Sequence, residues 1–212
     1  MRPIEQTALY PIINPKSLAV FGASNKYASM GTNLLTSIMS LGFEGKIYPV
    51  HLTEKTVKGL PAYASVEDLP AIPELALMVL PTRIVPDALE ACGRKGIRRA
   101  IVVSGGFKEV GGEGIALEKQ ICDIAAKYGI RFLGPNCIGI INQENGMSLP
   151  FVIFDPAKMK KGPVSVLAQS GGIVMDSMRL LTLENIGMNK VLCIGNKLDL
   201  NECDYLSFFL ED

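Results

Sequence analysis

The residues best suited to chemistry stand in a glycine-bounded turn near the start of the chain. The run Gly22-Ala23-Ser24-Asn25-Lys26 follows an apolar segment at 18–21, and the next glycine is Gly31. In an open α/β sheet, the turn after the first strand presents backbone N–H groups and the positive end of a helix to phosphate oxygens. The dinucleotide pattern G-x-G-x-x-G is absent. The turn predicts a phosphate-bearing ligand of unspecified kind, with a plain structural turn as the alternative.

The end of the second predicted strand carries cations where a nicotinamide cofactor would need an acid. NAD-binding proteins place an acid about 20 residues beyond the glycine turn to hold the ribose hydroxyls. Here His51 follows the strand, and the nearest acid, Glu54, is followed by Lys55 and Lys58. Cations at this place suit a phosphate on the ribose better than a free pair of hydroxyls. His51, the only histidine, is either a ribose or adenine contact or a solvated loop residue.

Three further turns have residue types that suit ligand binding. In Pro81-Thr82-Arg83, the guanidinium of Arg83 is either a bidentate phosphate ligand or a solvated group at a helix start. Ser104-Gly105-Gly106 either lets the backbone approach a ligand closely or forms a plain turn. The N–H groups of Ser170, Gly171 and Gly172 either form an anion cradle at a helix N-terminus or belong to an ordinary strand–helix turn.

Strands and helices alternate along the first part of the chain. Strands are predicted at 18–21, 47–50, 75–80, 100–103 and 131–133, and helices at 32–41, 85–95 and 113–128. Short strands rich in Val, Ile and Leu that alternate with helices of ten or more residues indicate βαβ units. The sequence therefore predicts an α/β fold with a Rossmann-like, doubly wound parallel sheet. Ligands of such sheets lie beyond the carboxyl ends of the strands, where these turns would be.

A second unit follows a break in this pattern. The stretch 155–163 is basic and contains two prolines, so we expect a linker at 155–162 between a first domain at 1–154 and a second at 163–212. The second domain is predicted to contain strands at 164–167 and 191–194, a helix at 173–183 and a C-terminal helix. Two strands leave a sheet edge unpaired and bury little core. Either the chain has been cut short of its natural end, which we favour, or a partner completes the sheet.

Composition argues against several classes of function. The 212 residues carry a formal net charge of zero, whereas nucleic-acid binders depend on a basic surface. No apolar run approaches the ~20 residues that cross a bilayer, and the N-terminus has proline and charge where a secretory signal has an apolar core. The five cysteines include no C-x-x-C pair, which indicates reduced thiols and no metal site. We expect a cytoplasmic protein with no nucleic-acid or membrane partner.

Five ordered segments carry a family resemblance. They are NPKSLAVFGAS, GKIYPV, VLPTRIVPDALEACGRKGIRRAIVVSGGF, GIRFLGPNCIGIIN and GPVSVLAQSGG…GNKLDLNECDYL. In their order and spacing, residues 14–212 resemble the NDP-forming acyl-CoA synthetases, the family of ADP-forming acetyl-CoA synthetase and a relative of the succinyl-CoA synthetase α subunit. The resemblance implies a CoA-binding Rossmann-like domain followed by the start of a flavodoxin-like succinyl-CoA-ligase domain.

By this resemblance, the strand ends of the first domain bind coenzyme A. The residues implied are Gly22, Ala23, Ser24, Lys26, Gly31, His51, Pro81, Thr82, Arg83, Ser104, Gly105, Gly106, Phe107, Asn136 and Cys137. The last two belong to the GPNC loop, near where the thiol arm would meet acyl phosphate, and the Asn136 amide would orient the reacting group. Cys137 is better explained as a small packed residue in a tight loop than as a nucleophile.

By the same resemblance, the second domain binds phosphate through Gln169, Ser170, Gly171 and Gly172. The family passes phosphate through a histidine that lies beyond residue 212. His51, which replaces an asparagine of the family's YPVNP pattern, is not that residue. Ala168 stands where the family has the first serine of S-Q-S-G, so one hydroxyl donor is missing. Asp199, Glu202 and Asp204 either take part in function or serve as helix-capping and solvated charges.

The implied activity of the intact enzyme interconverts acyl-CoA, ADP and phosphate with free acid, CoA and ATP, through acyl phosphate and phosphohistidine. ADP or ATP with Mg²⁺ would be held by an ATP-grasp module, fused or on a partner subunit, within an oligomer. This chain alone should not turn over. Two other classes stay open, namely a non-catalytic sensor half of a protein acetyltransferase, which the missing serine favours, and a NAD(H)-binding regulator or oxidoreductase.

Overall fold

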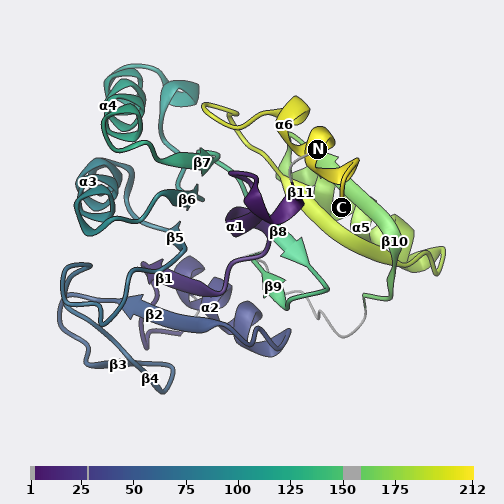
Figure 1. Cartoon of the computed structure of the whole chain (residues 1–212), viewed down its shortest axis with the longest axis horizontal. Coiled ribbons are helices and arrows are strands. Elements are labelled where there is room, and N and C mark those ends of the chain that lie inside the picture. Colours follow the sequence, from purple (N-terminus) through teal and green to yellow (C-terminus); the bar gives the residue numbers. More distant parts are fainter. Residues whose placement is uncertain (1–2, 28, 150–158) are drawn as a thin grey trace.

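A parallel five-stranded sheet forms the first half of the molecule (Figure 1). The computed structural model describes residues 3–27, 29–149 and 159–212. The strands lie in the order β2-β1-β5-β6-β7 and all neighbours are parallel. Their bounds are β1 (Ser17–Phe21), β2 (Lys46–Val50), β5 (Leu75–Met78), β6 (Arg99–Val102) and β7 (Arg131–Leu133). The predicted doubly wound sheet is confirmed.

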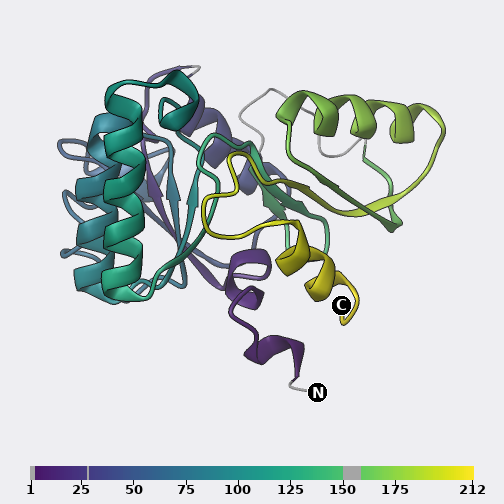
Figure 2. The ribbon, with the colours of Figure 1, turned by 90° about the horizontal axis from the view of Figure 1, so that it is seen from above.

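Three helices cover this sheet: α2 (Met30–Ser40), α3 (Val85–Lys95) and α4 (Glu113–Tyr128). Helix α2 begins two residues earlier than predicted because Ser29 caps it, with the Thr32 N–H donating to Ser29 Oγ over 3.3 Å. Helices α3 and α4 end at Gly96 and Gly129, whose positive φ angles of 101° and 64° close a helix without strain. Figure 2 shows α3 and α4 on one face of the sheet and α2 on the other.

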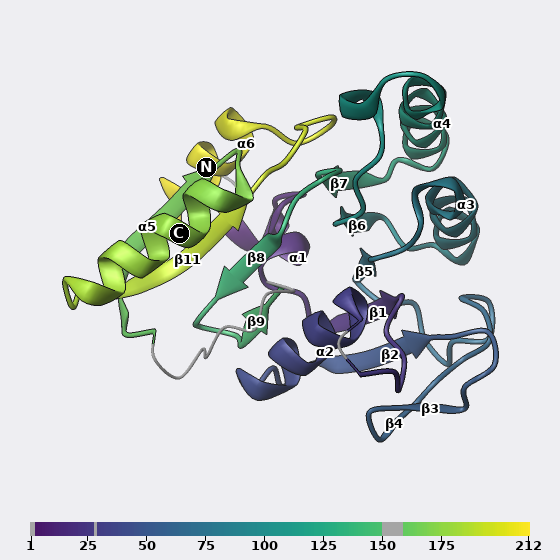
Figure 3. The same ribbon diagram turned by 180° about the vertical axis from the view of Figure 1, so that it is seen from behind.

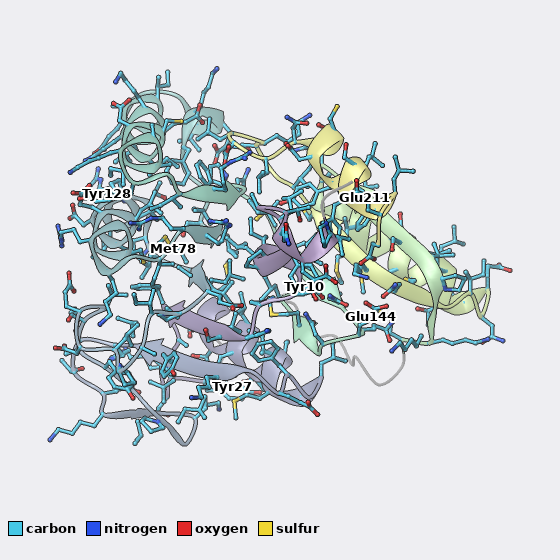
Figure 4. The ribbon with its side chains drawn as sticks, in the orientation of Figure 1. Tyr10, Tyr27, Met78, Tyr128, Glu144 and Glu211 are labelled. Carbon is cyan, nitrogen blue, oxygen red and sulfur yellow. The ribbon has the colours of Figure 1, made fainter. Side chains whose placement is uncertain are left out.

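Both faces of the sheet are buried, as parallel sheets require. Successive strand residues point to opposite faces. Ala19 and Phe21 of β1 share a core with α3 and α4, together with Met78 at the end of β5 (Figure 4). Leu18 and Val20 belong to the other core, which also contains residues of α2 and of the second sheet. The second half of the chain therefore packs on the face that α2 covers only in part.

The second sheet has four strands, in the order β10-β11-β8-β9. Its elements are β8 (Gly139–Asn142), β9 (Met147–Ser148), β10 (Lys161–Ala168), α5 (Gly171–Leu183), β11 (Met188–Cys193) and α6 (Glu202–Phe209). The predicted two-stranded sheet is wrong, because β8 and β9 supply antiparallel neighbours to β11, for example Val191 opposite Ile141. A short apolar segment such as Gly139–Asn142 has no sequence feature that tells which of two sheets it joins. Its place is seen only in the structure, from the register of its pairing with β11.

The first strand of the second domain begins earlier than predicted, inside the expected linker. Residues 155–158 of the predicted linker lie outside the described residues, and β10 begins at Lys161, inside that predicted range. Lys161 pairs with Met188, and the register shifts before Val164 and Val166. The boundaries 1–154 and 163–212 stay predictions.

Several short elements have no counterpart in the sequence-based expectations. They are η1 (Ile4–Gln6), α1 (Tyr10–Ile13), β3 (Thr56–Val57), β4 (Leu60–Pro61), η2 (Thr82–Ile84) and η3 (Lys108–Val110). The β3–β4 hairpin turns at Lys58 and Gly59, which both have positive φ, 51° and 82°, as a tight hairpin turn requires. Two-residue strands are too short to show periodicity. None of the helices in the described part of the chain is both long and apolar enough to span a bilayer.

Figure 3 shows the second sheet beside the first, with β8 continuing from β7. The two sheets are joined by a polar seam as well as by the shared core. Arg131 Nε of β7 donates to both carboxylate oxygens of Asp199, at 2.9 and 3.0 Å, and the Phe132 N–H donates to the same carboxylate at 2.8 Å. Within the second half, the fully buried Lys190 ammonium pairs with Glu144 at 2.9 Å and with Asp212; Glu144 is labelled in Figure 4. Such a buried charge is tolerated only because carboxylates surround it.

Candidate functional site

Apart from Gly31, which lies in α2, the predicted site residues of the first domain follow the carboxyl ends of parallel strands. Gly22 follows β1, His51 follows β2, Pro81 follows β5, Ser104 follows β6 and Asn136 follows β7. Because these strands are neighbours, their turns lie along one edge of the sheet (Figure 1). The sheet therefore brings together turns that are far apart in the sequence.

Two glycines allow the first turn to pack tightly. Gly22 has a φ of +88°, and a Cβ there would lie 1.9 Å from the Val79 carbonyl oxygen. A Cβ on Gly31 would lie 2.3 Å from the Gly22 carbonyl oxygen. Both residues are needed for backbone packing between β1, β5 and α2. Their first role is therefore structural. Because glycine has no side chain, the ligand contacts predicted for Gly22 and Gly31 would have to be made by their backbone N–H groups.

Most N–H groups in the middle of this turn are already used. Ser24 N–H donates to Thr32 Oγ1 at 3.0 Å and Lys26 N–H donates to Ser24 Oγ at 3.2 Å. By contrast, the N–H groups of Gly22 and Ala23 have no hydrogen-bond partner among the described residues. The free donors thus lie directly at the strand end, which is where an anion would be held.

A clamp that the sequence did not suggest joins this turn to the β3–β4 hairpin. The backbone and side-chain N–H groups of Asn25 donate to Glu54 Oε2 at 3.0 and 2.6 Å, and Asn25 Oδ1 accepts from the Lys58 N–H at 2.9 Å. Glu54 is thereby occupied within the protein. It does not take the position of a ribose-binding acid.

The cations predicted near the ribose are exposed and unpaired. Lys26, Lys55 and Lys58 lie on this turn and hairpin, and within the described residues none forms an ion pair. His51 is half-buried, and its Nδ1 accepts from the N–H groups of Thr53 and Glu54 at 3.3 and 3.0 Å. His51 therefore supports its own loop, while its predicted ligand contact stays a prediction.

The turns after β5 and β6 are tied to each other. Thr82 Oγ1 donates to the Gly105 carbonyl oxygen. Ser104 Oγ donates to the Leu80 carbonyl oxygen at 2.7 Å and accepts from its N–H at 3.0 Å. The hydroxyl of Ser104 is therefore fully occupied. Any ligand contact from these two turns would have to come from other groups, above all the backbone.

Arg83 is exposed, whereas Phe107 is buried. Arg83 Nη2 pairs with Glu113 at 2.8 Å, and both side chains are largely exposed. Exposed pairs of this kind are weak, so the guanidinium can turn toward a ligand. Phe107 is buried in the core under α3 and α4, so only its backbone can face a ligand. Thr82, Arg83, Gly106 and Glu113 line a surface pocket of about 630 Å³.

Glu109 is a residue that sequence reasoning missed. Its Oε1 accepts from the N–H groups of Gly106 and Phe107 at 2.6 and 3.2 Å, and its Oε2 accepts from Asn196 Nδ2 at 2.7 Å. Burial alone would raise the pKa of Glu109, but these hydrogen bonds outweigh it and hold the pKa below its ordinary value. Asn196 also accepts from Asn136 Nδ2 at 3.3 Å. A polar chain thus crosses from the first half of the molecule to the second.

The GPNC loop is the covalent connection between the two sheets, since it runs from β7 to β8. Asn136 has a φ of 57° and its N–H donates to the Ser104 carbonyl oxygen at 2.9 Å. Cys137 is buried, its Sγ donates to the Val102 carbonyl oxygen at 3.5 Å, and burial raises the pKa of its thiol. A neutral, hydrogen-bonded thiol is a poor nucleophile. The structure supports a packing role for Cys137.

The second glycine turn is less tightly held. Gln169 Nε2 donates to the Gly195 carbonyl oxygen at 3.1 Å, which fixes the turn to β11. Ser170 is the N-cap of α5, but its side chain makes no capping hydrogen bond. Gly171 and Gly172 begin the helix, whose first N–H groups have no partners within the helix. The arrangement leaves donors for an anion, although Gln169 itself is committed elsewhere.

The Ser104-Gly105 turn, the GPNC loop and the start of α5 border one pocket. It has a volume of about 480 Å³ and lies between Ser104, Gly105 and Asn136 of the first half and Gly171 and Gly172 of the second. We call it the junction pocket. It joins the strand ends predicted to bind coenzyme A to the helix end predicted to bind phosphate.

The remaining acids of the second half have structural roles. Asp199 binds Arg131 in the seam, Glu202 pairs with Lys197 at 2.6 Å, and Asp204 forms a capping box with Asn201 at the start of α6. All five cysteines are free thiols.

Comparison with known proteins agrees with this architecture. Residues 16–143 match the CoA binding domain family, and residues 161–212 match the succinyl-CoA ligase like flavodoxin domain. The chain belongs to the family of CoA-binding domains, and it continues into a succinyl-CoA-ligase-like domain, as the resemblance implied.

Relatives with established names are ligases. The chain is 37% identical to the α subunit of ADP-forming acetate–CoA ligase I of Pyrococcus furiosus over 209 residues. The aligned region covers 97% of this chain and 45% of that protein. The chain is 40% identical over 199 residues to ADP-forming acetate–CoA ligase of Methanocaldococcus jannaschii, covering 93% of this chain and 27% of that protein. This chain therefore spans less than half the length of these relatives.

A solved structure shares the fold over nearly the whole chain. Dinucleotide-forming acetyl-coenzyme A synthetase 1 of Candidatus Korarchaeum cryptofilum superposes with a TM-score of 0.90 at 35% identity, covering 96% of this chain and 43% of that one. The same synthetase is known in complex with phosphate and ADP.

Proposed function

We propose that the first half of this chain binds coenzyme A within an NDP-forming acyl-CoA synthetase. The observation that carries the proposal is the alignment of five strand-end turns along one sheet edge, with unpaired Lys26, Lys55 and Lys58 at one end and the junction pocket beside the other turns. The cations suit the 3′-phosphate of coenzyme A. The free N–H groups of Gly22 and Ala23 suit its pyrophosphate.

When bound, coenzyme A supplies the thiol that receives the acyl group. The chain's own residues bind and position. Asn136 borders the junction pocket and holds its amide against Asn196, so it would orient a reacting group there. The N–H groups of Gly171 and Gly172, with the free hydroxyl of Ser170, would hold phosphate oxygens at the positive end of α5. Ala168 contributes no hydroxyl, so backbone donors carry this part of the site.

The proposed activity of the whole protein is the conversion of acyl-CoA, ADP and phosphate into acid, CoA and ATP. An ATP-grasp module, fused or on a partner subunit, would bind the nucleotide with Mg²⁺, and the protein would act in the cytoplasm, where these substrates are available. The ADP-forming ligases among its relatives support this proposal over a sensor or a nicotinamide-binding regulator. The same relatives, of which this chain spans less than half, support further domains or subunits.

Isothermal titration of this chain with CoA, 3′-dephospho-CoA and NADH tests the ligand. We expect CoA to bind about 10-fold or more tightly than dephospho-CoA, since a desolvated phosphate–ammonium pair contributes on that scale. NADH should not bind in the same concentration range. Tight binding of NADH with none of CoA would overturn the proposal.

Lysine variants locate the site. Lys26→Ala and Lys58→Ala should weaken CoA binding and leave dephospho-CoA binding nearly unchanged. Lys46→Ala is the matched control, because Lys46 lies at the amino end of β2, where it lines a separate cavity of about 1000 Å³ with Lys16 and Asn145. Equal losses in all three variants would show that the lysines act only through net charge.

A further inference from the structure

A cavity of about 1000 Å³ opens at the amino ends of β1 and β2, at the edge of the first sheet opposite the strand-end turns. Strand β1 has five residues, so at ~3.3 Å per residue the two edges are about 15 Å apart. The walls come from α1, the loop between α2 and β2, and the turn between β8 and β9, so both halves of the molecule contribute. We call this cavity the amino-edge pocket. Its lining side chains include Tyr10, Lys16, Phe43, Glu44, Lys46 and Tyr48.

Two lysines of the amino-edge pocket carry charges that no carboxylate neutralises. Lys16 and Lys46 are exposed, and within the described residues neither ammonium forms an ion pair or a hydrogen bond. The nearby acid Glu74 instead accepts from the backbone N–H of Lys16 at 2.8 Å. The Lys46 N–H donates to the Lys16 carbonyl oxygen at 3.0 Å, which holds the two residues side by side. Two free ammonium groups in one pocket favour an anion with more than one negative charge.

A buried hydroxyl in the same pocket lacks a partner. Tyr48 is only 9% exposed, and its ring packs edge-on against Tyr63 with 6.1 Å between the ring centroids. Among the described residues the Tyr48 hydroxyl has no hydrogen-bond partner, although Tyr48 lines the pocket. A buried hydroxyl without a partner is unfavourable. An oxygen of a ligand in the pocket would accept its hydrogen bond.

Two carboxylates also line the pocket, and only one of them has a free charge. Glu144 pairs with the fully buried Lys190 at 2.9 Å and accepts from Asn189 Nδ2 at 3.2 Å, so its charge is neutralised. Glu144 and Tyr10, which lie on walls from the two halves, are labelled in Figure 4. Glu44 is exposed and has no hydrogen-bond partner among the described residues. The pocket therefore contains two free cations against one free carboxylate.

Aromatic rings supply much of the remaining wall. Tyr10, Phe43 and Tyr48 all line the pocket. A Cβ at Gly45 would lie 2.3 Å from Phe43 Cζ, so the Phe43 ring packs directly against Gly45. Aromatic side chains offer flat surfaces on which planar rings such as nucleobases stack. The volume lies at the upper end of the range for small-molecule sites, roughly 300–1000 Å³, which is large enough for a nucleotide.

We propose that the amino-edge pocket is a second ligand site, which binds a nucleoside diphosphate as an effector. The phosphates would lie against the ammonium groups of Lys16 and Lys46 and accept from the Tyr48 hydroxyl, and the base would stack on Tyr10 or Phe43. A ligand held there is too far from the strand-end turns to take part in chemistry at them. It would instead tie the β8–β9 turn to the first sheet and stabilise the contact between the two halves.

NMR titration of this chain with ADP, inorganic pyrophosphate and adenosine tests the inference residue by residue. The amides of Gly45 and Gly146 report on the amino-edge pocket, and those of Gly22 and Ala23 report on the first glycine turn. We expect ADP to shift the Gly45 and Gly146 amides and to bind at least about 10-fold more tightly than pyrophosphate or adenosine, because only ADP uses both the cations and the rings. Shifts confined to Gly22 and Ala23, no shift at all, or equal binding of ADP and pyrophosphate would overturn the inference.

A pair of tyrosine variants isolates the buried hydroxyl. Tyr48→Phe keeps the ring that packs in the core and removes only the hydroxyl, so the fold should be kept while ADP binds about 10-fold more weakly, the scale of a hydrogen bond to a charged group. Tyr63→Phe is the matched control, because Tyr63 contacts the Tyr48 ring but does not line the pocket. It should leave ADP binding unchanged. Equal losses in the two variants would contradict the proposed contact.

Charge variants test the sign of the electrostatic effect. Lys16→Gln and Lys46→Gln should each weaken ADP binding about 3-fold, the scale of an exposed ion pair. Glu44→Gln should strengthen it about 3-fold, because the substitution removes the free carboxylate. Changes in the same direction in all three variants would rule out the proposed site.

The amino-edge pocket and the proposed CoA site can fail separately. If CoA shifts the Gly22 and Ala23 amides while ADP leaves those of Gly45 and Gly146 unmoved, the effector site is wrong and the CoA site stands. If ADP shifts Gly45 and Gly146 while CoA leaves Gly22 and Ala23 unmoved, the effector site stands and the proposed function is wrong.

Discussion

The two glycine turns of this protein have the same local plan but are stabilised in different ways. Each connects a parallel strand to the N-terminus of a helix, at Gly22 and at Gly171. The first is held by internal contacts, namely the packing of Gly22 against Val79, the Ser29 cap of α2, and the clamp between Asn25 and Glu54. The second has a serine N-cap that makes no capping bond.

The difference separates preorganised binding from reversible binding. A turn whose shape is set by its own contacts can present fixed donors to a large ligand without a further cost of ordering. A helix end with unused donors can take up and release a small anion. We expect the first turn to tolerate substitution poorly, and the second to tolerate it well in stability but poorly in phosphate binding.

The largest expected effect comes from replacing one glycine in each turn, Gly22 in the first and Gly172 in the second. Gly22→Ala places a Cβ 1.9 Å from the Val79 carbonyl oxygen at a φ of +88°, so the free energy of unfolding should fall by about 3 kcal/mol or more. At Gly172 the nearest atom to an added Cβ is 3.7 Å away. Gly172→Ala should therefore raise the free energy of unfolding by about 0.5 kcal/mol or less. Urea denaturation of both variants checks the contrast. Similar losses would mean that the two turns are equally constrained.

The clamp on the first turn should have the next largest effect. Glu54→Ala removes the acceptor of two hydrogen bonds from Asn25, so it should cost about 1 kcal/mol of stability and weaken CoA binding about 10-fold because the turn is no longer preorganised. Calorimetry and urea denaturation measure the two effects. Glu44→Ala, an exposed residue between α2 and β2, is the control. If CoA affinity were unchanged in Glu54→Ala, the clamp would have no part in binding.

The contact that links the two halves should show a pH dependence. The pKa of Glu109 is lowered in the folded protein, so its stabilising contribution is present above the ordinary carboxyl pKa of about 4.3 and is lost as pH falls through that range. Wild type should therefore be more stable than Glu109→Gln at pH 7, and the difference should be smaller at pH 3. Urea midpoints at both pH values test this. In an Asn196→Ala background the difference at pH 7 should shrink, because the two side chains interact directly.

The smallest expected effect on stability comes from the N-cap of α5. Ser170→Ala removes no capping bond, so the unfolding free energy should stay within about 0.3 kcal/mol, whereas Ser29→Ala removes one and should cost about 1 kcal/mol. Ser170→Ala should nevertheless weaken binding of inorganic phosphate about 3-fold, measured by amide shifts of Gly171 and Gly172 in NMR titrations. A stability loss equal to that of Ser29→Ala would show that the two caps are alike.

Much of the first sheet could be predicted because each strand and helix carries its own signal. The apolar runs before Gly22 and Ser104, and the helical periodicity of α3 and α4, are local properties of the chain. The turns proposed to bind ligand could be found in the same way, since they follow those strands directly. The Asn25–Glu54 clamp and the hydrogen bond from Asn196 to Glu109 could not be found, because the two residues of each pair are 29 and 87 positions apart in the chain.

The sequence by itself determined the order of strands and helices in the first half, the absence of a dinucleotide fingerprint, and the glycine turns that allow close backbone approach. These follow from side-chain periodicity and backbone sterics, which act over a few residues. Tertiary structure alone decided that β8 and β9 complete the second sheet, that Asp199 binds Arg131, and that two remote turns enclose one apolar pocket. Those outcomes depend on strand register and on contacts between distant segments, which a local pattern does not specify.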